Sequence, residues 1–249
     1  MTLSAQRARR WRQILFELVP ELPGEWSVRG TGLGTSLVRE PLDWALCWIG
    51  YSGSPSRPVG WVSAGVQPLV TPPLGFELTY GIRMDEVRAG PRTVDLLSDD
   101  AADGTRRFVL DAALAKIDAW PAERLAEVAE RDFAQEPHRR RRHWHHLPGW
   151  RVASGTGSPV EPAERLAELC RQEVGTATGR GNQARDHLGD GRVGARLADR
   201  GAFYERLSEA WRDGGSGAAL RLLAEQRDQA LGACKLDRVA TAPPLDPTP

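Results

Sequence analysis

The chain has 249 residues, of which 41% are hydrophobic and 27% charged, a composition typical of folded proteins rather than disordered ones. Lys+Arg and Asp+Glu both total 33, so the formal net charge is zero, which excludes the global basic excess of non-specific nucleic-acid binders. This length accommodates one large domain or two modest ones.

The cysteines and the apolar segments indicate in which cellular compartment the protein is expected. Cys47, Cys170 and Cys234 are far apart and form no metal-type spacing, so reduced thiols are the simplest interpretation. The apolar run ILFELV near the N-terminus is too short for a signal-peptide core, and no run approaches a membrane span. We therefore expect a cytoplasmic protein that does not contact a membrane.

The N-terminal part predicts one helix followed by strands. Residues 4–19 have a helical pattern that Ser4 can cap and Pro20 ends, with an apolar stripe of Trp11, Ile14, Leu15 and Leu18. Five segments with strand character follow: WSVRG, TSLVRE, WALCWIGYS, VGWVSAGVQPLV and GFELTYGIRM. In the last, Phe76, Leu78, Tyr80 and Ile82 share one face. This spacing favours an antiparallel meander of about four or five strands.

Helices are expected after the strands. One is predicted from about 105 to 120, with a stripe of Leu110, Ala113, Leu114 and Ile117, and the next begins at Pro121, a residue favoured at the first helical position. The order indicates an α+β fold, an antiparallel four- to five-stranded sheet with helices on one face, followed by a helical C-terminal region.

A Gly-, Ser- and Pro-rich stretch, RVASGTGSPVEP, suggests a division of the chain. We interpret 1–146 as an α+β domain, 147–161 as a linker, 162–238 as a helical region and 239–249 as a disordered tail. Helices are expected at about 162–174, 201–213 and 217–234.

The first part resembles a family. The helix RRWRQIL, the strand PLDWALCWIGYS, and GVQPL followed by FELTYGIR resemble the helix–sheet–helix pattern of uncharacterised bacterial domains, including domain-of-unknown-function class 4304, over about residues 5–130. Some of these domains lie near toxin or defence genes. The resemblance implies a binding or neutralising role, and it supplies no active-site residues.

No catalytic or cofactor signature is visible in the sequence. Gly189, Gly191 and Gly194 match G-x-G-x-x-G, but the preceding NQARDHL does not have the pattern of a buried strand, so we expect no cofactor. There is no G-x-S-x-G elbow, HExxH or P-loop. Enzymatic activity stays an alternative, since an active site can be assembled from residues that are scattered in the sequence. The absence of a catalytic motif favours a non-catalytic protein.

The stretch HRRRRHWHHLPGW, residues 138–150, holds four of the five histidines. His143, His145 and His146 could bind a metal, but four adjacent arginines repel a cation and no carboxylate completes the shell, so we expect none. Arg139, Arg140, Arg141 and Arg142 could instead neutralise phosphates while Trp144 stacks on a base. The third interpretation is a charged connector whose arginines face solvent or upstream glutamates.

Tryptophans carry the first functional hypothesis. Trp44, Leu46 and Trp48 share one strand face, Ala45, Cys47 and Ile49 the other, and the Trp61 strand is also apolar on both faces. The second face must be covered, either by the C-terminal helices or by a partner or ligand. We therefore hypothesise a non-catalytic interaction or accessory protein, immunity- or defence-like, that binds another protein through Trp44, Trp48 and Trp61. The alternatives are a nucleic-acid-associated protein using the arginines at 139–142, and an enzyme of unrecognised type.

Overall fold

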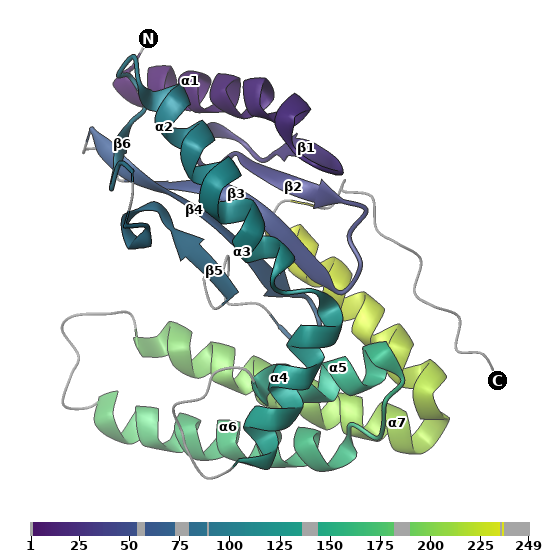
Figure 1. Ribbon diagram of the computed structural model, residues 1–249. Helices are drawn as coiled ribbons and strands as arrows, with labels where there is room; N and C mark the ends of the chain where they lie inside the picture. Colours follow the sequence, from purple (N-terminus) through teal and green to yellow (C-terminus); the bar gives the residue numbers. More distant parts are fainter. Residues whose placement is uncertain are drawn as a thin grey trace. The chain divides into compact units, whose positions relative to one another are not determined.

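The computed structural model describes residues 2–53, 58–72, 80–88, 90–135, 144–181, 190–234 and 236, with backbone alone for 175–181 and 190–194 (Figure 1). The chain divides into two compact units. The first contains the described residues of Met1–Gln67, Gly75–Pro121 and Leu231–Pro243, and the second those of Pro68–Leu74 and Ala122–Ala230.

The first unit is built on one sheet. Its strands are β1 (Glu25–Arg29), β2 (Ser36–Glu40), β3 (Ala45–Gly53), β4 (Val59–Pro68), β5 (Tyr80–Arg83) and β6 (Val94–Asp95). They lie in the order β1-β2-β3-β4-β5, with β6 paired to β4. The pairs β1–β2, β2–β3, β4–β5 and β4–β6 are antiparallel. The predicted α+β class and antiparallel sheet are confirmed, and β6 is an addition that the sequence did not reveal.

Helix α1 (Leu3–Leu18) packs through the stripe that the sequence predicts, since Trp11, Ile14, Leu15 and Leu18 are buried. The expected cap is wrong by two residues: Thr2, not Ser4, precedes the helix, and its hydroxyl accepts from the Ala5 amide. A 3-10 turn, η1 (Val19–Glu21), follows at Pro20. A second one, η2 (Gly32–Gly34), connects β1 to β2.

The helices of this unit lie on one face of the sheet. The Trp11 ring of α1 is 5.7 Å from that of Tyr51 on β3, and the Trp11 indole N–H donates to the Thr35 carbonyl oxygen at 2.7 Å. Trp120, after the last helix of the layer, meets Tyr80 edge-on at 4.9 Å. Tyr51 and Tyr80 therefore mark the helix-covered face.

The predicted apolar stripe of the next helix is partly wrong because the helix contains a π-helical turn. Helix α2 (Ala101–Phe108) begins four residues earlier than expected and continues through η4 (Val109–Ala113) into α3 (Leu114–Asp118). Val109, Ala113 and Ile117 are buried, whereas Leu110 and Leu114 of the expected stripe are only half-buried. The wider π turn accommodates an extra residue and rotates the following side chains relative to a regular α-helix.

The second unit is helical. Its elements are α4 (Ala122–Ala134), η5 (Trp144–His146), α5 (Leu147–Ser154), α6 (Val160–Gly181) and α7 (Asp190–Ala233), except that the last residues of α7, from Leu231 on, belong to the first unit. Helix α5 lies within the predicted linker 147–161, and Leu147, Trp150 and Val152 on it are buried, so 147–154 is packed helix rather than connector. Residues 239–249 lie outside the described residues.

Helix α7 contains one interruption. Gly214 and Gly215 have non-helical torsions, and Gly215 has φ 63° and ψ −155°, a region that essentially only glycine adopts. The break separates two helical stretches where the sequence predicts helices at 201–213 and 217–234. In the described residues, no helix combines the length and apolar character needed to cross a membrane.

Candidate functional site

Exposure separates the three tryptophans of the predicted binding face. Trp44 is 3% exposed and Trp48 is 5% exposed, so both are core residues. Trp61 on β4 is half-buried and keeps surface accessible to a ligand. The strand alternates as expected, because Val62, on the opposite face, is fully buried.

Trp61 is held by a neighbouring ion pair. The Arg83 guanidinium lies over the Trp61 indole, 5.2 Å from the ring centroid. Its Nε and Nη2 donate to the two carboxylate oxygens of Asp85 at 2.5 and 2.7 Å, which gives a bidentate pair. A cation over the face of an indole is stabilised by the negative charge density of that face. Indole, guanidinium and carboxylate thus form a fixed array, which we call the Trp61 array.

Strand register and a tight turn assemble the Trp61 array. Ser63 on β4 pairs with Arg83 on β5, which places Trp61, two residues earlier on the same face, diagonally adjacent to the arginine. Immediately after β5 the chain enters the 3-10 turn η3 (Met84–Glu86). This turn directs the Asp85 carboxylate back onto the guanidinium.

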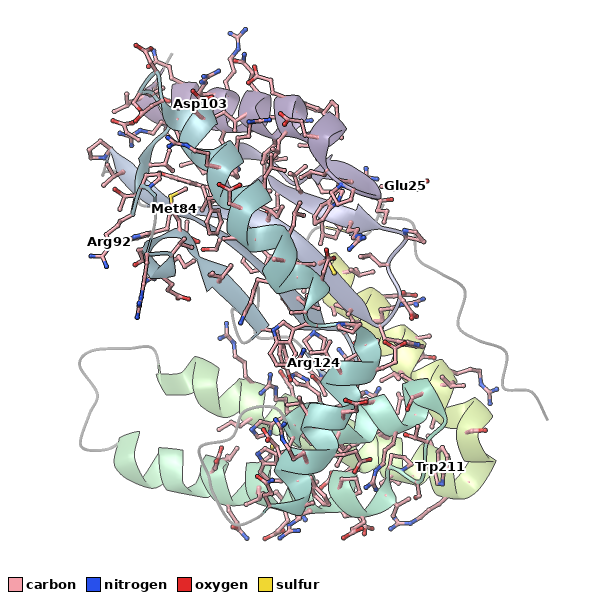
Figure 2. The ribbon with its side chains drawn as sticks, viewed as in Figure 1. Glu25, Met84, Arg92, Asp103, Arg124 and Trp211 are labelled. Atoms are coloured by element: carbon pink, nitrogen blue, oxygen red, sulfur yellow. The ribbon has the colours of Figure 1, made fainter. Side chains whose placement is uncertain are left out.

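Charge and exposure around the array favour recognition of another surface. The Arg83 hydrogen bonds hold the pKa of Asp85 below its usual range, and Arg92 acts in the same direction. Arg92 points outward from the unit (Figure 2), and Val59, two residues before Trp61 on the same face, is 39% exposed. The array therefore combines an accessible ring with a charge pair that is already neutralised, and it lies next to the accessible aliphatic side chain of Val59.

A second group of polar side chains surrounds η5 in the second unit. His146 is buried, and its Nδ1 lies 2.9 Å from the Thr71 hydroxyl. The Tyr204 hydroxyl on α7 donates to the His145 carbonyl oxygen at 2.9 Å. Trp144, the base-stacking residue of the nucleic-acid hypothesis, instead stacks on His145 with the ring centroids 5.2 Å apart.

His145 is kept neutral by its surroundings. Burial lowers the pKa of its imidazole to about 4, and the positive charge of Arg200 contributes in the same direction. Arg200 is held in place because its Nε donates to the Pro72 carbonyl oxygen at 3.3 Å. A neutral ring at physiological pH fits a packing role better than an anion-binding one.

The Thr71–His146 pair resembles a hydroxyl activated by a base, but burial argues against catalysis. A nucleophile needs its base within hydrogen-bond reach, which this distance satisfies. Thr71, however, is only 1% exposed and His146 4%, so a substrate has no approach to either. The pair fixes the segment around Thr71 instead.

The other predicted sites are only partly visible. His143 and the arginines at 139–142 lie outside the described residues. Within the described residues, no three His, Cys, Asp or Glu side chains are placed to hold a metal ion. Gly191 and Gly194 of the glycine motif lie inside α7, and Gly189 is outside the described residues. A helical backbone at these two glycines does not form a phosphate-binding loop.

Sequence reasoning missed the partners that build these groups. Arg83 and Asp85 gave no signal because their contact with Trp61 depends on the pairing of β4 with β5. The alternation of β5 did place Arg83 opposite Tyr80 and Ile82, so a correct pairing would have revealed the array. Thr71 and Tyr204 are distant in sequence from the histidines and carried no signal.

Comparisons with known proteins give no match: no family model, no curated protein and no solved structure is similar to this chain at a significant level.

Proposed function

We propose that this protein is a non-catalytic binding protein whose partner is another protein and whose recognition surface is the Trp61 array. The observation that carries the proposal is the half-exposed Trp61 indole, fixed by Arg83, which Asp85 in turn holds through two hydrogen bonds. The array refines the original hypothesis of a tryptophan face, since Trp44 and Trp48 are buried.

The energetics of protein interfaces support this assignment. Tryptophan and arginine are the residues most enriched among interface hot spots, where truncation costs about 2 kcal/mol or more. The Trp61 array adds two advantages. The guanidinium charge of Arg83 is already paired with Asp85 before a partner binds. The Trp61 ring is also held in position before binding, so little side-chain entropy is lost on association. The resemblance of the sequence to domains near toxin and defence genes implies a protein that binds and neutralises its partner, which agrees with this proposal.

The test is partner capture from the native host with the full-length protein as bait, followed by a binding measurement with the purified partner. Trp61→Ala is expected to weaken binding by about 30-fold or more, the equivalent of 2 kcal/mol. Asp85→Asn releases Arg83 and should weaken binding less. Trp211→Ala is the matched control, because Trp211 is another half-buried tryptophan, on α7. It is expected to bind normally.

Far-UV spectra that match the wild type and a cooperative melting transition above the assay temperature establish that each variant is folded. Equal partner affinity for the wild type and Trp61→Ala would exclude the array as the recognition surface. Equal losses for Trp61→Ala and Trp211→Ala would indicate a general loss of structure rather than a specific contact.

A further inference from the structure

Helix α1 has a second exposed surface that the proposed function does not use. Its buried side faces the sheet through Trp11 and its stripe. Arg9, Arg12 and Phe16 lie on the opposite side, because residues spaced by four and seven positions share one face of an α-helix. All three are exposed. We call these three residues the α1 face.

The arginines of the α1 face are available for an anionic ligand. In the part of the chain that the structure describes, neither Arg9 nor Arg12 has a carboxylate partner. By contrast, Arg106 of the same unit is paired with Glu21. The only carboxylate of α1 is Glu17, which accepts from Gln13 at 2.7 Å. The helix therefore carries an excess of positive charge although the whole chain has none.

Phe16 gives this basic surface an aromatic platform. Its side chain is 53% exposed, an unusual position for a phenylalanine. The Arg12 guanidinium lies over the ring, 5.3 Å from the centroid. Planar guanidinium groups and aromatic rings both stack on nucleobases, and neighbouring arginines neutralise the phosphates.

The small apolar area of the α1 face distinguishes between three anionic ligands: a protein, a membrane and a nucleic acid. A stable protein interface covers about 800 Å² per partner, and its centre is apolar. An amphipathic helix that binds a membrane inserts a continuous apolar face. The α1 face offers one large apolar side chain, which suits neither, whereas stacking of a base requires one ring. We propose that the α1 face binds single-stranded nucleic acid, with Phe16 stacking on a base and Arg9 and Arg12 contacting phosphates.

The test uses the full-length protein and fluorescent oligo(dT) and oligo(U), with binding followed by anisotropy between 50 and 200 mM salt. Phe16→Ala is expected to lower the affinity at least fivefold, and Phe16→Tyr should restore it because the ring is kept. Replacing Arg9 and Arg12 with Ser should reduce the slope of log affinity against log salt by about 1.4, since each phosphate contact contributes about 0.7. Leu3→Ala is the matched control and should bind normally, because Leu3 is also 53% exposed on α1 but lies on another side.

Three results would overturn the proposal. The first is the absence of salt-dependent binding by the wild type. The second is binding that survives both the Phe16→Ala and the double arginine change, which would locate nucleic-acid binding elsewhere, for example at 139–142. The third is binding of poly-glutamate or anionic vesicles as tight as, or tighter than, that of the oligonucleotides, if Phe16→Ala and the double arginine change abolish it. This result would identify an acidic peptide or a lipid surface as the ligand. None of these results depends on the Trp61 array, so the two proposals fail separately.

Discussion

The neutral His145 makes the stability of the second unit depend on acid. In the folded protein its imidazole has a pKa of about 4, against an ordinary value of 6.5, chiefly because of burial and secondarily because of Arg200. The unfolded chain therefore binds a proton at His145 more readily than the folded chain does. Stabilisation from the neutral ring is complete above pH 6.5 and is lost as the pH falls towards 4.

The magnitude follows from the pKa difference. One pKa unit corresponds to about 1.4 kcal/mol, so a change from 6.5 to about 4 is worth about 3 kcal/mol when the pH has fallen below both values. Part of the His145 side chain remains in contact with water, which weakens the effect. We therefore expect His145 to account for a loss of about 2 kcal/mol in the free energy of unfolding between pH 7.5 and 4.

The assay compares the wild type with His145→Gln in urea unfolding at pH 7.5, 6.5, 5.5, 4.5 and 4. Carboxylates titrate in both proteins, so their contribution cancels in the difference between the two curves. The wild type should lose more stability than the variant over this range. NMR of the histidine rings in the folded protein measures the His145 pKa directly.

Two observations would refute this reasoning. Parallel stability curves for the wild type and His145→Gln would show that the ring does not couple folding to pH. A His145 resonance that titrates near 6.5 in the folded protein would show that the ring is not desolvated.

Three further predictions concern backbone fit and thiol reactivity. Gly215→Ala should lower the free energy of unfolding by about 1–3 kcal/mol because Gly215 has a positive φ of 63°. Gly217→Ala, in the helical stretch after the break, should raise it by up to about 1 kcal/mol. Chemical denaturation measures both values, and equal effects of the two changes would contradict the non-helical torsions of Gly215. Gly149→Ala should lower the melting temperature, since its Cβ would lie 2.2 Å from the Val70 carbonyl oxygen, and an unchanged melting temperature would exclude this close approach. Burial raises the pKa of the Cys47 thiol to about 11, so little reactive thiolate is present at pH 8. Iodoacetamide should therefore alkylate Cys47 much more slowly in the folded protein than in the urea-unfolded chain, as followed by peptide mass spectrometry. Equal rates in the two states would contradict the raised pKa.

Periodicity in the sequence predicted those parts of the fold in which one face of an element is buried. The stripe from Trp11 to Leu18 located α1, because it follows from which side of the helix meets the core. Apolar segments bounded by glycine and proline located β1 to β5, whereas the two-residue β6 gave no such signal. The stripe at Leu110 and Leu114 was misplaced because a π turn has no residue signature. It shifts the buried positions without changing the composition of the segment.

Helix α5 was missed because its residues resemble a loop. Pro148 and Gly149 are ordinarily helix breakers, yet both suit their positions here. Proline is tolerated in the first turn, where its missing N–H has no helical partner. Gly149 is required because the Val70 carbonyl passes so close that no side chain fits. Only the tertiary contact explains the glycine, and the sequence does not contain that contact.

The three tryptophans show why local patterns predict a candidate face but not its accessible part. Alternation placed Trp44, Trp48 and Trp61 on apolar strands, but exposure depends on what packs there, and only Trp61 remains accessible. The consequence is measurable. Trp44→Ala and Trp48→Ala should each lower the free energy of unfolding by about 3–5 kcal/mol, because each leaves a large cavity in the core. Trp61→Ala should cost distinctly less in urea unfolding. A cost at Trp61 equal to that at Trp44 would mean that Trp61 too is a core residue, which would remove the central element of the proposed binding surface.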